Sequence, residues 1–190
     1  MVKGPFPARL GKSGLVWGRG VSLPPAGGPV KKEGDLRSPA GIFELGGVYG
    51  TVPRRRKSVP CRTAALRRGT CGWMTPASPL YNQHFVLKHD PVTPWEFKQQ
   101  MKLNDYAHSL KLFIRHNAAD GRRKPVPGAG SSIFFHIWRR DGGAPTAGCT
   151  AMSEENLRAM IAWLDPSRHP LYILLPAREY LRLRRAWGLP

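Results

Sequence analysis

The sequence predicts a mainly β domain of the sandwich or barrel kind with a few peripheral α-helices. Two observations predict this fold: many short apolar segments lie between turns, and the content of turn residues is high. The 21 glycines and 19 prolines together make up 40 of the 190 residues, well above average usage. So many turn residues exclude a helical bundle or a coiled coil, and 41% hydrophobic residues exclude disorder of the whole chain.

Six short apolar segments lie between clusters of glycine, proline and polar residues, and we expect each of them to form a β-strand. They are residues 14–17, 42–45, 85–87, 110–115, 131–138 and 171–175.

Three further segments carry helix signals. Residues 93–96 (Thr-Pro-Trp-Glu) form a capping box with proline at the first helical position, which predicts a helix to about Lys102. Ser153 is the expected N-cap of a second helix, in which apolar residues recur at i, i+3, i+4 and i+7 from Leu157. This helix should end before the Asp-Pro pair at 165–166. A third helix is expected over residues 176–187, with Gly188 as its stop.

The length fits a single domain over residues 1–190, and the sequence has no internal repeat. Residues 51–78 differ from the rest because they are basic, rich in turn residues and without hydrophobic periodicity. We expect them to form an excursion from the domain. Two interpretations of this excursion stay open, a lid over a cleft and a solvated loop.

The chain carries 30 Lys and Arg against 12 Asp and Glu, a formal charge of +18. The basic residues stand in short separate runs and not as a stripe on one helix, and no aromatic ladder accompanies them. The charge therefore indicates a preference for anionic partners, such as the polymers of a bacterial envelope, and does not predict nucleic-acid binding.

Nothing in the sequence predicts a membrane span, because no stretch of about 18 apolar residues occurs. Residues 1–20 also lack the apolar core of a secretory signal. Composition leaves open whether the protein works in the cytoplasm or reaches the envelope.

The most informative local pattern joins a histidine to a cysteine. His136 lies near the end of the expected strand 131–138, on the opposite side from Ile133, Phe135 and Ile137. A glycine-rich turn follows, and Cys149 comes directly after Gly148, just before the expected N-cap at 153. This arrangement can bring an imidazole and a thiol within hydrogen-bond reach.

Such a pair indicates nucleophilic catalysis, because only the thiolate attacks and a free thiol is a few per cent ionised at pH 7. An imidazole can take the thiol proton and return it to a departing amine. The glycine leaves room for a substrate carbonyl near backbone N–H groups, as in an oxyanion hole. A second interpretation stays open: free cysteine is often simply buried, and a histidine at a strand end is often only a satisfied polar group.

The chain resembles the L,D-transpeptidase catalytic domains of the YkuD type. Their signature is a histidine, a loop of a dozen or more residues, and Ser/Thr-His-Gly-Cys; here the chain has His136 and then Thr-Ala-Gly-Cys at 146–149. Further segments typical of the envelope branch of this family make the resemblance cover nearly the whole chain. They are residues 11–18, 31–35, 38–43, 78–82, 101–106, 117, 127–134, 163–166 and 187–190.

Residue by residue, the resemblance implies that Cys149 is the nucleophile, His136 the general base and acid, Gly148 the glycine beside the oxyanion and Thr146 the Ser/Thr of the signature. Two departures affect substrate positioning. The second histidine of the signature is Ala147 here, and the basic or amide residue that usually follows the cysteine is missing from residues 150–152.

The resemblance implies a two-step acyl transfer on peptidoglycan stem peptides. The cysteine attacks the carbonyl of the third stem residue, the terminal D-Ala leaves, and the acyl group passes to an amine of a second stem as a 3→3 cross-link. Transfer to water, which is L,D-carboxypeptidase action, stays an alternative, as does a non-catalytic module that binds anionic envelope polymers. The resemblance also implies an extracytoplasmic location, in the periplasm or cell envelope, and requires no cofactor.

Three other residues are candidates for lining the substrate site: Trp138, Tyr81 and Asn82. Each has an equally good structural interpretation, since a large amphipathic ring packs well in a core and an amide often binds backbone. The remaining histidines, His84, His89, His108, His116 and His169, are expected to be structural.

The three cysteines allow one disulfide and one free thiol. Cys61 and Cys71 lie ten residues apart and could pair, which would leave Cys149 free, but two reduced cysteines are an equal alternative. A metal site is not expected, because no two cysteines have the spacing of zinc ligands.

Overall fold

The computed structural model describes residues 4–22, 24–51, 63–65, 70–72, 74–101, 104–120 and 123–190. Nine strands and a few short helices occur in this part of the chain, so the prediction of a mainly β fold is confirmed. The strands are β1 (Leu15–Trp17), β2 (Ser38–Gly50), β3 (Thr63–Ala65), β4 (Thr70–Gly72), β5 (His84–Val86), β6 (Leu110–Ile114), β7 (Phe134–Ile137), β8 (Thr150–Met152) and β9 (Leu171–Leu174).

The helices are short and lie at the periphery. They are α1 (Pro94–Lys98), α2 (Glu154–Trp163) and α3 (Ala177–Leu183), with 3₁₀ turns at Tyr106–His108 (η1), Arg140–Gly142 (η2) and Pro166–Arg168 (η3). The capping box before α1 and the Ser153 cap of α2 both form as expected. Helices α1 and α3 are shorter than the sequence predicted. No helix in the described ranges is long and apolar enough to cross a membrane.

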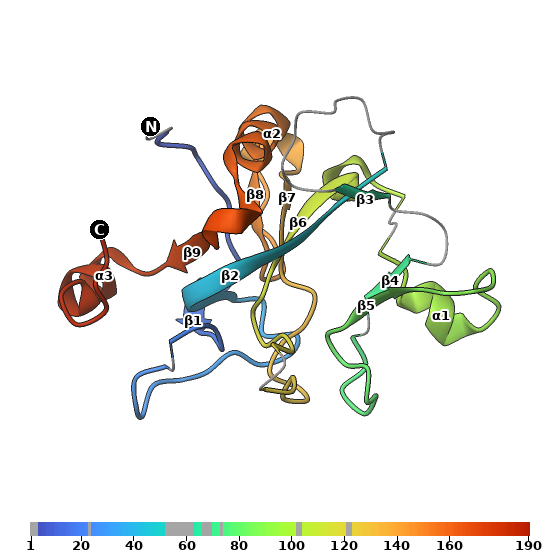
Figure 1. Cartoon of the computed structure of the whole chain (residues 1–190), viewed down its shortest axis with the longest axis horizontal. Helices are drawn as coiled ribbons and strands as arrows, with labels where there is room; N and C mark the ends of the chain where they lie inside the picture. The colour runs from blue at the N-terminus through green and yellow to red at the C-terminus, as the bar shows by residue number, and fades with distance from the viewer. Residues whose placement is uncertain are drawn as a thin grey trace.

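The long strand β2 organises the sheet, because different strands pair with its two halves (Figure 1). Its first half pairs with β1 in parallel and with β9 in antiparallel orientation, and its second half pairs with β6 and β3. The register shifts between Leu45 and Val48, where two glycines stand. A bulge bends a strand, so one strand can contribute to both parts of the sheet.

The order β2-β6-β7-β8 continues the sheet, and β7 and β8 run parallel at its end. Figure 1 shows the small β4–β5 pair and α1 on one side of this sheet, and β9 and α3 on the other.

The main core covers one face of the β6–β7–β8 sheet, where α2 packs. Every second residue of β6 and β7 enters it, including Leu112 and Phe135, together with Leu157 and Ile161 of α2. The intervening residues Phe113 and Phe134 belong to a smaller cluster with Met101. This alternation leaves the second face of β7 and β8 for the chemistry-bearing side chains.

Candidate active site

Cys149 and His136 lie on the same face of the sheet. In the parallel register of β7 and β8, His136 pairs with Ala151 and Phe135 with Thr150, so Cys149 lies beside Phe134. The Phe134 N–H donates to the Cys149 Sγ at 3.4 Å. Because side chains alternate along a strand, Cys149, Phe134 and His136 all point away from the main core.

The thiol and the imidazole are not hydrogen-bonded to each other. The Cys149 thiol donates to the carbonyl oxygen of Ser132 at 3.7 Å, and within the described chain no hydrogen bond joins it to the His136 ring. Apo catalytic pairs are often loosely aligned and tighten when substrate binds. The geometry is therefore compatible with a pair that is completed by the substrate.

A backbone carbonyl fixes the tautomer of His136. Its Nδ1 lies 2.7 Å from the Ile137 oxygen, so Nδ1 carries the proton and Nε2 keeps its lone pair. Burial lowers the pKa of His136 to about 4, although the Ile137 carbonyl opposes the shift; nearby cations, Lys111 among them, lower it further. The ring is consequently neutral at pH 7, as a general base must be.

Cys149 is half-buried, and its surroundings act on the thiol in opposite directions. Burial raises the pKa of the Cys149 thiol. The Phe134 N–H, Lys111 and Lys31 lower it, because each stabilises the thiolate. At neutral pH the thiol therefore keeps its proton until a base accepts it.

The turn before β8 is held in shape by Thr146. Its hydroxyl donates to the Cys149 carbonyl at 2.6 Å and accepts from the Gly148 N–H at 3.1 Å. Ser38 donates to the same Cys149 carbonyl at 3.2 Å. Outside the sheet ladder, no hydrogen bond of the Cys149 N–H occurs among the described residues, and we expect this N–H to serve a substrate oxygen.

Gly148 cannot be replaced without strain. Its φ is +145°, and a Cβ at this position would lie 3.0 Å from the Arg37 carbonyl oxygen. Gly148→Ala is expected to cost about 1–3 kcal/mol of unfolding free energy and to slow acylation of Cys149 at least tenfold. Gly14→Ala is the matched control, because its φ is +82° and its Cβ would meet open space. Thermal melts and acylation rates of both variants test this: equal acylation rates would contradict it.

The three candidates for substrate contact lie in different surroundings. Trp138 is half-buried, and its ring packs over Gly142. The Asn82 side chain is buried and bonds the backbone of His116, Asn117 and Ser132. Tyr81 is also buried and donates to Glu33. Asn82 therefore supports the backbone at Ser132, and Tyr81 binds Glu33. Substrate contact by the three residues stays a prediction.

Sequence reasoning missed the groups that pack against His136, the candidate general base. The His108 ring stacks on the His136 ring with centroids 4.7 Å apart. Asp105 accepts from the His108 Nδ1 at 2.7 Å and pairs with Arg139. Burial raises the pKa of the Asp105 carboxyl, but these hydrogen bonds outweigh burial and bring the pKa down to about 2.

Lys111 was missed as well. It is a single lysine in an otherwise apolar strand, and that interruption is the signal that could have drawn attention to it.

The expected alternatives for Cys61 and Cys71 were a disulfide and two reduced thiols, and Cys61 lies outside the described residues. Cys71 is a buried free cysteine whose sulfur accepts from the Gln100 amide at 3.2 Å. Most of the excursion 51–78 also lies outside the described residues. Within the described ranges, no group of three or more His, Cys, Asp or Glu side chains could hold a metal ion.

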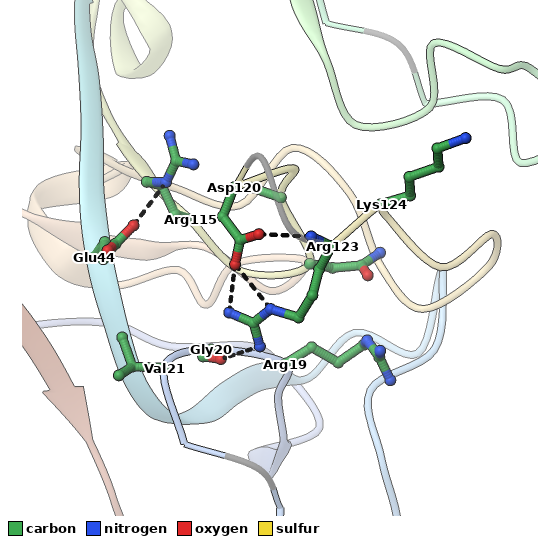
Figure 2. Close-up of a pocket in the computed structure, with 10 residues that line it drawn as sticks. Arg19, Gly20, Val21, Glu44, Arg115, Asp120, Arg123 and Lys124 are labelled. Carbon is green, nitrogen blue, oxygen red and sulfur yellow. Dashed lines mark hydrogen bonds and ion pairs between the residues drawn. The ribbon is translucent and has the colours of Figure 1, made fainter.

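The residues that line a charged pocket include neither Cys149 nor His136 (Figure 2). Arg115 pairs with Glu44 at 3.1 Å, and Arg123 pairs with Asp120 at 2.6 Å and donates to the Gly20 carbonyl at 3.0 Å. These ion pairs join neighbouring segments of the chain, so two of the cationic side chains that line the pocket, Arg115 and Arg123, stabilise the fold. Arg19 and Lys124 extend beyond these pairs in the same view.

Acidification is expected to destabilise the fold. His116 is fully buried, and burial lowers its pKa to about 4, as it does for His136. The unfolded chain binds these protons near pH 6.5. Between about pH 6.5 and 4 the unfolded state therefore binds more protons than the folded state does. As the pH is lowered through this range, the unfolding free energy decreases by at most about 1.4 kcal/mol per pH unit for each histidine.

Urea unfolding at pH 7, 6 and 5 measures this slope. His136→Gln should lose part of it, whereas the variant of an exposed histidine, His169→Gln, should keep it. An unfolding free energy that stays constant over this range would contradict the burial of neutral histidines.

Comparison with known proteins places the chain in a family. Residues 6–173 match the model of the YkuD L,D-transpeptidase catalytic domain, which is nearly the whole chain. No curated protein and no solved structure shows significant similarity to it. The chain belongs to the L,D-transpeptidase family, whose members are acyltransferases with a cysteine nucleophile that act on peptidoglycan stem peptides.

Proposed function

We propose that this L,D-transpeptidase family member forms an acyl-enzyme on Cys149, with His136 as general base and acid. Two observations support it above all: the two side chains share the face of β7 and β8 that points away from the main core, and the Ile137 carbonyl holds His136 Nδ1. The Nε2 lone pair is thereby reserved for proton transfer.

The first half-reaction cleaves the bond between the third stem residue and D-Ala. His136 Nε2 takes the Cys149 thiol proton, and the sulfur attacks the carbonyl carbon of the third residue. A C–S bond forms, the C–N bond breaks, and the imidazolium gives its proton to the departing D-Ala amine. The products are a thioester on Cys149 and free D-Ala.

The oxyanion of this step needs hydrogen-bond donors. Thr146 already occupies the Gly148 N–H, so the Cys149 N–H is the donor that remains for the substrate oxygen. Gly148 contributes by having no side chain, and Thr146 by fixing the turn. Loss of one oxyanion donor typically costs about 3 kcal/mol of transition-state stabilisation.

The second half-reaction transfers the acyl group to an amine of a second stem. The amine attacks the thioester carbonyl, a C–N bond forms, and the C–S bond breaks. His136 accepts the amine proton and returns it to the thiolate, which regenerates the enzyme. The product is a 3→3 cross-link.

The surroundings of the reaction are the periplasm or cell envelope, where the substrate polymer lies. The net charge of +18 supports attraction to this anionic material. Contacts with the anionic polymers are electrostatic and should weaken as salt rises.

Incubation with disaccharide tetrapeptides and analysis of the products by mass spectrometry tests the proposal. Free D-Ala together with a cross-linked dimer is the expected result. Free D-Ala with only trimmed tripeptide would instead indicate L,D-carboxypeptidase action. Binding to peptidoglycan without D-Ala release, unchanged in Cys149→Ala, would identify a non-catalytic binding module and contradict the proposal.

A further inference from the structure

Lys111 places a positive charge inside the protein, beside the candidate catalytic pair. Its side chain is 3% exposed, and its partners across the sheet are His136 on β7 and Tyr49 on β2. Residues that pair across strands have their side chains on the same face. The Lys111 side chain therefore lies on the face that carries His136 and Cys149.

Within the part of the chain that the structure describes, this ammonium group forms no ion pair with a carboxylate. Its Nζ donates to the Met101 carbonyl oxygen at 2.5 Å and lies 5.4 Å from the centroid of the Phe134 ring. None of the ion pairs among the described residues includes Lys111. Burying an ammonium group without an anionic partner costs free energy. A lysine at this position is best explained by an anion that forms beside it only during the reaction.

Cys149 is the group that can supply this anion. Met101 and Phe134, which the Lys111 ammonium contacts, pack in one cluster with Cys149. The Phe134 backbone N–H is also the donor to the Cys149 sulfur. Burial lowers the pKa of Lys111 to about 8, and attraction to Cys149 opposes this shift, so the ammonium keeps its proton at pH 7.

We propose that Lys111 is an electrostatic positioning residue that stabilises the Cys149 thiolate during acyl transfer without touching the substrate. This inference rests on the proposed role of Cys149 as nucleophile. The ammonium is held by the Met101 carbonyl on the same face of the sheet as Cys149, and it supplies the counter-charge that the thiolate needs once the thiol has lost its proton.

The same charge acts on the general base. Lys111 repels a proton on His136, so it keeps the ring neutral before attack and favours proton release to the leaving amine. The other titratable and charged groups around Lys111 and Cys149 are Lys31, His84, Asp105, His108 and Arg139. Asp105 also attracts the Lys111 ammonium, but its hydrogen bonds and ion pair are made with His108 and Arg139.

Replacing Lys111 by methionine tests the proposal because the shape is kept and the charge is lost. Alkylation of Cys149 by iodoacetamide is followed by peptide mapping from pH 6 to 10, and NMR follows the His136 ring. We expect Lys111→Met to raise the pKa of the Cys149 thiol and to slow its alkylation at pH 7 about tenfold, which corresponds to one pKa unit. The His136 pKa should rise as well.

A purely structural role predicts the opposite sign at the sulfur. Loosened packing would admit water and return the thiol pKa towards its ordinary, lower value, while the His136 pKa would still rise. A thiol titration that is unchanged or shifted downwards in Lys111→Met would therefore overturn the proposal.

Two further variants complete the experiment. Lys111→Arg keeps the charge, so Cys149 in this variant should be alkylated at pH 7 as fast as in the parent. If Lys111→Met does not fold, Lys111→Arg alone provides the test, and slower alkylation than in the parent would then count against the proposal. Lys88→Met, which removes an exposed lysine, should leave the titration unchanged.

These measurements need no peptidoglycan. A parent protein that shows the Lys111 effect but releases no D-Ala would contradict the proposed function, and with it the role of Lys111 in acyl transfer. A parent that releases D-Ala and whose thiol titration is unchanged in Lys111→Met would contradict this inference alone.

Discussion

Replacing Cys149 by alanine is expected to lower kcat/KM for D-Ala release by about 10⁴-fold or more, because the covalent route through the thioester is lost. No other sulfur in the described chain can take over. Cys71, the other described cysteine, is fully buried, and burial raises the pKa of its thiol. Release of D-Ala from a synthetic tetrapeptide measures the effect.

Cys71→Ala is the matched control, since it also removes one thiol. It should keep the activity of the parent at 25 °C, with some loss of stability from the cavity that it leaves. D-Ala release by Cys149→Ala at the rate of the parent would contradict the assignment of the nucleophile.

The second large effect is expected at the general base. His136→Gln should lower kcat/KM by about 10²- to 10⁴-fold, the usual contribution of a positioned proton acceptor. The ring must be neutral to accept the thiol proton, and burial lowers its pKa to about 4. The parent should therefore lose activity only as the pH falls through about 4.

The pH profile of kcat/KM from pH 4 to 10 separates the two proteins. The glutamine variant cannot accept the proton, so its residual rate should rise with pH as the thiol ionises by itself. His169→Gln replaces an exposed histidine and should retain the profile of the parent. A parent-like rate and profile in His136→Gln would show that another group takes the proton.

Local patterns predicted the elements that position the site, because their signals lie within a few residues. Alternation in residues 133–137 placed the isoleucines and Phe135 in the core and His136 on the other face, and the structure confirms this. The Ser153 cap likewise predicted α2 correctly.

Other elements depend on pairing with distant strands. Strand β8 has only three residues, too few for a periodic pattern, and it forms because it pairs with β7. Strand β2 extends well beyond the predicted 42–45, since β1, β9, β6 and β3 supply partners on either side of its glycines. Neither set of partners can be read from the local sequence.

The candidate pair could be predicted, but its electrostatic surroundings could not. His136 and Cys149 lie in one continuous motif of the family. Lys111 lies beside His136 only because β6 pairs with β7 in this register. The same pairing lets the His108 ring stack on the His136 ring. Both contacts join residues that are more than 20 positions apart.

The most direct test of the account is the site of the covalent intermediate. The protein is incubated with a stem tetrapeptide, quenched in acid, digested and mapped by mass spectrometry. We expect the tripeptide acyl group as a thioester on the peptide that contains Cys149, formed at least a hundredfold more slowly in His136→Gln. An acyl group on any other residue, or D-Ala release with no adduct under rapid quench, would contradict a reactive sulfur paired with the imidazole of β7.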